Sequence, residues 1–199
     1  MTTLPDRADI VIIGGGIVGC SVAYHLTKLG LNDVVLFERK QLTCGTTWHA
    51  AGLVGQLRAS KNMTRLAQYS TELFANLAAE TGQETGYQAT GSMTLALNAE
   101  RLEELKRQAT MANAFNVACE LIGPDFVQER WPGIDTSDVH GGVYLPGDGQ
   151  TNPVDTTLAL AKGARSAGAK IFENTAVQRL AIENGQVIGV YLDGDTLVR

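Results

Sequence analysis

The sequence predicts an α/β protein with a parallel β-sheet, and three features near the N-terminus carry this prediction. A short β-branched run at residues 10–13 is typical of a buried parallel strand. A G-x-G-x-x-G motif at residues 14–19 follows at once, and an apolar helical stretch continues from it. A second apolar run at residues 34–37 ends at Glu38, 24 residues beyond the first glycine. This order of strand, glycine turn, helix, strand and acid indicates a Rossmann-like unit that binds a dinucleotide.

Each glycine of the motif has an expected task. Gly14 makes the tight turn, Gly16 lets the backbone approach a pyrophosphate, and Gly19 lets the helix lie close to the strand. The first helical residues, Ile17 and Val18, present free N–H groups and the positive end of the helix dipole to the phosphates. We therefore expect these five residues to bind the cofactor.

The acid at the end of the second strand indicates which dinucleotide fits. A carboxylate at Glu38 accepts hydrogen bonds from ribose hydroxyls and repels a 2′-phosphate, which argues against NADP. The motif by itself does not separate FAD from NAD.

The composition argues against several other classes of protein. The net charge is −5 and the pI about 5.2, with no cluster of Lys or Arg, so no nucleic-acid partner is expected. Three widely spaced cysteines and three histidines favour reduced thiols and no metal centre. The longest apolar run, residues 10–20, is too short for a membrane span. Without a targeting pattern, a cytoplasmic location is expected, or the mitochondrial matrix if the source is eukaryotic.

The rest of the chain alternates helices and strands without repeats. We expect a helix at 62–82 whose buried face holds Leu66, Tyr69, Leu73 and Leu77, because these residues recur at three and four. Two further helices are expected to begin after asparagine N-caps, at Asn98 and Asn152. The remaining expected elements are a helix at 124–134 and strands within 91–97, 119–123, 141–153, 169–174 and 176–199.

An unusual loop, GTTWHAAGL at residues 45–53, follows the second strand. Glycine and hydroxyls suit close approach to phosphate or ribityl oxygens, small residues leave room for a flat ring system, and a tryptophan can exclude water. An unprotonated imidazole is a good nucleophile, so His49 could bond to the 8α-methyl carbon of a flavin. The expected binding residues of the loop are Gly45, Thr46, Thr47, Trp48, His49, Ala50, Ala51, Gly52 and Leu53.

The stretch IIGGGIVGCSVAYHLTKLGLNDVVLFERKQLTCGTTWHAAGL closely resembles the dimethylglycine and sarcosine dehydrogenase family, within the D-amino-acid-oxidase-like flavoenzymes. The resemblance implies covalent FAD at His49, with Glu38 and Arg39 flanking the adenosine ribose. It also implies that the backbone of Val177 meets the adenine. The fold implied is an FAD-binding domain in two stretches, 1–85 and 146–199, interrupted at 86–145 by the start of a mixed-sheet substrate domain.

The resemblance also implies an activity, the oxidative demethylation of an N-methylated glycine to an iminium. Electrons would pass to an electron-transfer flavoprotein or to oxygen, and full-length members often carry a folate-binding C-terminal half. The chain reads as an N-terminal fragment that would be poorly stable and inactive alone, so no catalytic acid or base is assigned. Two alternatives stay open: a non-enzymatic relative of the pyruvate dehydrogenase phosphatase regulatory subunit, and an amino-acid or glycine oxidase with non-covalent FAD.

Overall fold

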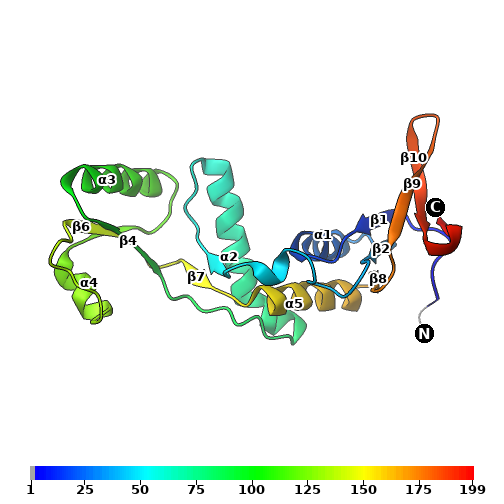
Figure 1. The fold of residues 1–199 in the computed structure, drawn as a ribbon, viewed down its shortest axis with the longest axis horizontal. Helices are drawn as coiled ribbons and strands as arrows, with labels where there is room; N and C mark the ends of the chain where they lie inside the picture. Colours follow the sequence, from blue (N-terminus) through cyan, green and yellow to red (C-terminus); the bar gives the residue numbers. More distant parts are fainter. Residues whose placement is uncertain (1–2) are drawn as a thin grey trace. The chain divides into compact units, whose positions relative to one another are not determined.

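The computed structural model describes residues 3–199, which fall into two compact units. The first unit comprises the chain up to Gly52 together with Asn76–Gly86 and Asn152–Arg199. The second unit comprises Leu53–Ala75 and Tyr87–Thr151. Figure 1 shows helices and strands in both units, so the predicted α/β class is confirmed.

The first unit is built on a three-stranded parallel sheet in the order β1-β2-β8. Its strands are β1 (Ile10–Ile13), β2 (Val34–Phe37) and β8 (Lys170–Phe172). Helix α1 (Ile17–Lys28) connects β1 to β2, and all four residues of the central strand β2 are buried. The predicted strand, glycine turn, helix and strand are therefore confirmed.

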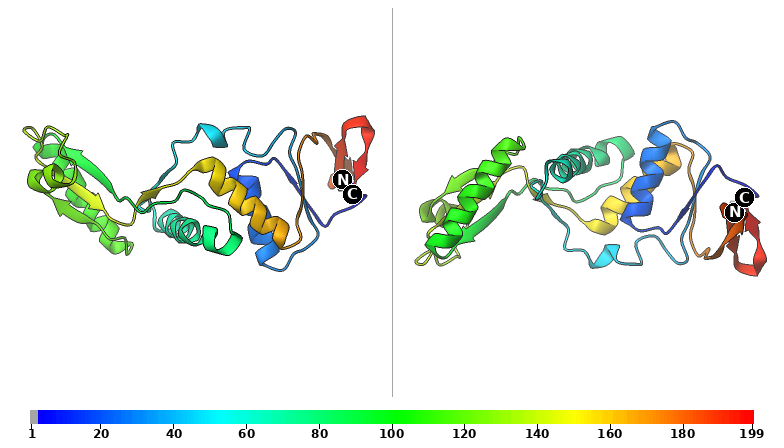
Figure 2. Two further views of the ribbon diagram at one scale, coloured as in Figure 1. Left: turned by 90° about the horizontal axis from the view of Figure 1, so that it is seen from below. Right: turned by 90° about the horizontal axis from the view of Figure 1, so that it is seen from above.

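Helix α5 (Pro153–Ser166) lies beside α1 in the first unit (Figure 2). A Cβ atom on Gly163 would lie 2.8 Å from the ring carbons of Tyr24, so the two helices approach closely because this position has no side chain. The predicted N-cap is confirmed, since Asn152 Oδ1 accepts hydrogen bonds from the backbone N–H groups of Val154 and Asp155.

An antiparallel sheet of β9 (Val177–Glu183), β10 (Gln186–Leu192) and β11 (Leu197–Val198) follows, with a 3₁₀ turn at Asp193–Asp195. Its apolar residues join those of β2 and β8 in one buried cluster. The rings of Phe37 and Phe172 stack in this cluster with their centroids 5.6 Å apart. The cluster fixes the sheet whose ends carry the glycine motif and the acid.

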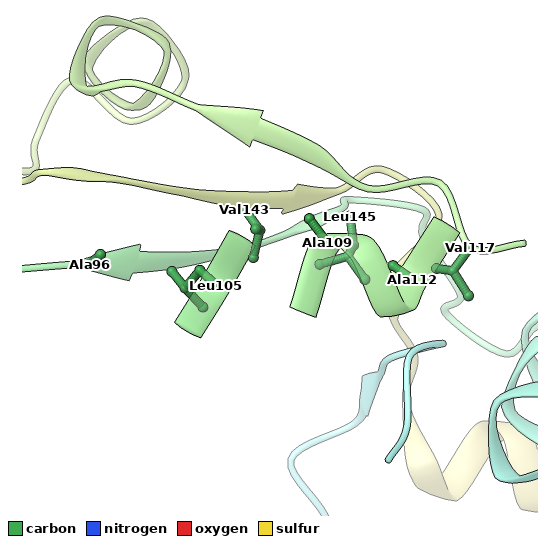
Figure 3. Packing of buried hydrophobic residues seen from close by; sticks show 7 residues of the cluster. All are labelled: Ala96, Leu105, Ala109, Ala112, Val117, Val143 and Leu145. Atoms are coloured by element: carbon green, nitrogen blue, oxygen red, sulfur yellow. The ribbon is translucent and has the colours of Figure 1, made fainter. Parts of the chain in front are cut away.

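The second unit has an antiparallel sheet in the order β4-β6-β5. Its strands are β4 (Ser92–Ala96), β5 (Glu120–Ile122) and β6 (Gly141–Leu145), and its helices α3 (Ala99–Ala114) and α4 (Pro124–Arg130). Figure 3 shows the buried residues of α3 packed with those of β4 and β6. Asn98 caps α3 as predicted, by accepting from the N–H of Arg101. A two-stranded ladder joins β3 (Leu53–Val54) to β7 (Gly149–Gln150).

Two predictions about helices are corrected. In α2 (Lys61–Thr81), Leu73 and Leu77 are buried as predicted, but Leu66 and Tyr69 are 57% and 45% exposed. The helix is divided between the units after Ala75, and Leu73 lies in the same part as Leu66 and Tyr69, so the apolar spacing alone does not decide which of them is buried.

The fourth predicted helix is also shorter than expected. Helix α4 ends at Arg130, not at residue 134, because Pro132 disfavours helical backbone at Trp131 and offers no N–H to continue the ladder.

The units are defined by compactness and differ from the predicted functional domains at three places. Residues 53–75 and 146–151 lie in the second unit, whereas the prediction places them in the FAD-binding stretches 1–85 and 146–199. Gly86 lies in the first unit, whereas the prediction begins the substrate domain there. Compactness does not show which residues contact a cofactor, so the assignment of 1–85, 86–145 and 146–199 stays a prediction.

Candidate functional site

A cavity of about 350 Å³ opens at the carboxyl ends of β1 and β2 in the first unit. In parallel α/β sheets, ligands bind outside the carboxyl ends of the strands. The predicted residues that line the cavity are Gly14, Gly16, Glu38, Arg39, Gly45, Thr46 and Val177. An adjoining hollow of about 340 Å³ is lined by Ile17, Val18, Gly19 and Thr47 together with Gly14, Gly16 and Thr46.

The glycine motif forms a cradle that side chains would fill. Gly14 has a φ of +108°, which favours glycine. A Cβ atom on Gly19 would lie 2.0 Å from the carbonyl oxygen of Gly14, so α1 begins in direct contact with the turn. At Gly16 a Cβ would lie 3.1 Å from Thr47 Oγ1. At the N-terminus of α1 the glycine motif therefore presents only backbone atoms.

The middle glycine of the triplet Gly14-Gly15-Gly16 was missed by the sequence reasoning. The backbone N–H of Gly15 donates to Glu38 Oε2, with 2.7 Å between nitrogen and oxygen, and this bond is buried. A Cβ atom on Gly15 would lie 2.5 Å from Leu42 Cδ2. The motif G-x-G-x-x-G leaves this position free to be any residue, so its spacing gave no signal for Gly15.

Glu38 is buried and held by several donors. Its Oε1 accepts from the N–H of Lys40 at 2.9 Å and from Cys44 Sγ at 3.5 Å. Burial raises the pKa of Glu38, but the N–H groups of Gly15 and Lys40, the Cys44 thiol and the charge of Arg39 outweigh it and lower that pKa. The side chain is therefore a fixed, charged acceptor at the wall of the cavity.

Three residues that line the cavity were not predicted, namely Ile13, Phe37 and Cys44. Ile13 and Phe37 are the last residues of β1 and β2. Because ligand cavities open at the carboxyl ends of parallel strands, the last residue of each strand is expected to line one. Cys44 was interpreted only as a reduced thiol; no disulfide is formed, and all three cysteines are free.

The loop after the cavity contains a short 3₁₀ turn, η1 (Thr47–His49). The backbone N–H of Ile17 donates to Thr47 Oγ1 over 3.0 Å, so the turn is tied to the N-terminus of α1. The rings of Trp48 and His49 lie 3.8 Å apart by their centroids, and Trp48 is 58% exposed. The exclusion of water by the indole stays a prediction.

The last residues of the loop lie outside both hollows. Ala50 and Ala51 are exposed, and Gly52 is buried with a φ of +75°. Leu53 begins β3 in the second unit, so its placement relative to the cavity is not described. The structure thus brings the glycine motif, Glu38 and residues 44–47 together around the two hollows. Residues 48–52, which include Trp48 and His49, line neither hollow.

Residues 3–199 contain no group of three or more metal-ligating His, Cys, Asp or Glu side chains. No helix in this part of the chain is long and apolar enough to cross a membrane.

Residues 9–198 match the FAD dependent oxidoreductase family, known as DAO. The chain belongs to the FAD-dependent oxidoreductase family. Human mitochondrial dimethylglycine dehydrogenase is 45% identical over 168 residues, which are 84% of this chain and 19% of that protein. The mitochondrial pyruvate dehydrogenase phosphatase regulatory subunit of Mus musculus is 42% identical over 190 residues, 96% of this chain and 22% of that protein.

Among solved structures, L-proline dehydrogenase from P. horikoshii superposes with a TM-score of 0.91 at 32% identity. The match covers 98% of this chain and 51% of that one, which confirms the predicted fold. The chain spans about a fifth of the length of the two curated relatives and about half of the solved structure.

Proposed function

We propose that this chain is the FAD-binding N-terminal part of an amine dehydrogenase that demethylates an N-methylated glycine, and that His49 holds FAD covalently. The observation that carries the proposal is the placement of the Thr47–His49 turn. The N–H of Ile17, at the start of α1, donates a hydrogen bond to Thr47, the first residue of this turn. His49 is the last residue of the same turn, two positions after Thr47. The 45% identity to dimethylglycine dehydrogenase supports the substrate class.

The residues of the first unit fit the ADP part of FAD. Gly14 and Gly16 line the cavity without side chains, and Gly19 lets α1 lie against the turn. The N–H of Val18 opens α1 beside them. The N–H of Ile17, which was expected to be free for the phosphates, instead donates to Thr47 Oγ1. Glu38 is held by Gly15, Lys40 and Cys44, and its Oε2, which accepts only from Gly15, retains a lone pair for a ribose hydroxyl. In this proposal Arg39 flanks the ribose, Val177 meets the adenine, and residues 45–53 follow the pyrophosphate and flavin.

When bound, FAD accepts a hydride equivalent from the N-methyl C–H of the amine, which becomes an iminium. The chain's own part in this reaction is to bind and orient. The glycine cradle and Glu38 fix the adenosine end, and His49 prevents loss of the cofactor. Residues 86–145 begin the domain that faces the substrate. The electron acceptor is an electron-transfer flavoprotein or oxygen, and folate belongs to a part of the relatives that this chain does not span.

Acid denaturation tests the covalent claim. The natural protein is precipitated with acid, and the flavin absorbance of pellet and supernatant is compared for the wild type, His49→Ala and His140→Ala. His140 is the matched control because it is an exposed histidine in the second unit. We expect the pellet to stay yellow in the wild type and His140→Ala and to become colourless in His49→Ala. Flavin in the supernatant of all three proteins would contradict the claim.

A second candidate function follows from the 42% identity to the pyruvate dehydrogenase phosphatase regulatory subunit. A non-enzymatic regulatory protein would bind the cofactor with the same cradle. The dehydrogenase and the regulatory protein are distinguished by adding dimethylglycine or sarcosine to the oxidised protein in the absence of oxygen. Bleaching of the flavin supports the dehydrogenase, and a folded, flavin-loaded protein that neither amine bleaches supports the regulatory relative. Flavin that bleaches with glycine and is released by acid supports the third reading, a non-covalent oxidase.

A further inference from the structure

The hydroxyl of Thr47 joins two segments that lie 30 residues apart in the sequence. Helix α1 begins after Gly16, an N-cap with no side chain to accept hydrogen bonds from the first turn. Thr47 Oγ1 supplies an acceptor for the N–H of Ile17 from outside the helix, at 3.0 Å. Such N-cap bonds stabilise a helix end by satisfying one of its orphan donors.

The packing around Thr47 differs from that of its neighbours in the loop. Thr47 is 6% exposed, whereas Thr46, Trp48 and His49 are all exposed. The close approach of Thr47 Oγ1 to Gly16 needs the glycine, since a Cβ there would lie 3.1 Å from the oxygen. Thr47 is also β-branched, so few rotamers are open to it and its hydroxyl direction is constrained.

The same residue begins the turn that carries the imidazole. The N–H of His49 donates to the carbonyl oxygen of Thr46 at 3.2 Å, and the N–H of Ala50 donates to that of Thr47 at 3.1 Å. The backbone of His49 is thus fixed two residues from the Thr47 contact.

We infer that Thr47 is a positioning residue, which anchors the turn carrying His49 to the N-terminus of α1. The inference rests on the proposed function. The Thr47 side chain then limits the motion of the His49 imidazole relative to the glycine motif, because its hydrogen bond joins the two segments. Attachment forms a bond between an imidazole nitrogen and the 8α-carbon of FAD. One hydrogen leaves each partner, and these hydrogens and their electron pair pass through the cofactor to dioxygen, giving hydrogen peroxide.

The test compares Thr47→Val, which keeps the shape and removes the hydroxyl, with Thr47→Ser, which keeps the hydroxyl. The matched control is Thr27→Val, because Thr27 is also 6% exposed and its hydroxyl bonds only to carbonyls within α1. Two quantities are measured on the natural protein: the rate at which added FAD becomes acid-stable, and amide hydrogen exchange of the peptide covering residues 45–50. Affinity for FAD is measured separately in the His49→Ala background.

We expect Thr47→Val to attach FAD roughly fivefold to tenfold more slowly, the size of one lost hydrogen bond, and to exchange faster at residues 45–50. Thr47→Ser should recover most of the rate, and Thr27→Val should match the wild type. Wild-type attachment and exchange in Thr47→Val would overturn the inference, as would a slow rate fully explained by weaker FAD affinity. If the wild type attaches no FAD, the covalent claim fails, and the exchange comparison alone supports or overturns the anchoring.

Discussion

At the scale of single residues, the site is organised by a carboxylate that the protein itself orients. Glu38 accepts from two backbone N–H groups and one thiol of the protein. The sequence predicted the acid from its distance beyond the glycine motif. Sequence reasoning could not predict its donors, because Gly15 and Cys44 reach it through the fold of two loops. Their types alone do not indicate a hydrogen bond to a particular side chain.

The lowered pKa of Glu38 makes stability depend on pH in a defined window. Its unfolded chain should titrate near 4.5, the ordinary value, and the folded protein at a lower pH. Between these two pH values the unfolded state binds more protons than the folded state. The free energy of unfolding therefore decreases as the pH falls through this range. We expect the fall below pH 4.5 to be shallower in Glu38→Gln, measured by urea unfolding. Exposed Glu129→Gln is the control, and an equal slope in all three proteins would refute the assignment.

At the scale of elements, the sequence predicted most of what positions the cavity. The glycine motif located α1, and asparagine N-caps located α3 and α5, because both are local signals. The same spacing gave the wrong burial for Leu66 and Tyr69, because burial depends on what packs against a helix and not on its pattern alone. The anchoring of residues 47–49 to α1 had no local signal, since it joins segments distant in the sequence.

The contact between the turn and α1 predicts the effect of a methyl group at Gly19. A Cβ there would lie 2.0 Å from a backbone oxygen, which cannot rotate away as a side chain can. We expect Gly19→Ala to lower the free energy of unfolding by about 1–3 kcal/mol, the usual cost of overpacking, and to weaken FAD binding. Gly133→Ala is the control, because nothing lies within 4 Å of its Cβ position. Denaturant unfolding and FAD titration measure both, and wild-type values for Gly19→Ala would show that the turn can relax.

At the scale of the whole molecule, the chain belongs to the FAD-dependent oxidoreductase family but spans only part of its relatives. Its first unit carries the cradle, the cavity and His49. Its second unit carries a sheet and helices with a separate core. The sequence therefore predicted family, cofactor and fold, which depend on the motifs it contains. It could not predict the substrate, because the motifs on which the prediction rests are those of a dinucleotide-binding unit.

The central claim, that FAD is covalently bound through His49, is tested most directly by peptide mapping. Trypsin cleaves after Lys40 and Arg58, so His49 lies in a peptide of residues 41–58 together with Cys44. We expect mass spectrometry of the flavin-containing protein to show this peptide heavier by one covalently bound FAD, with fragment ions that place the added mass on the imidazole. An unmodified 41–58 peptide from a protein that was fully loaded with FAD, or the added mass on Cys44, would contradict the account.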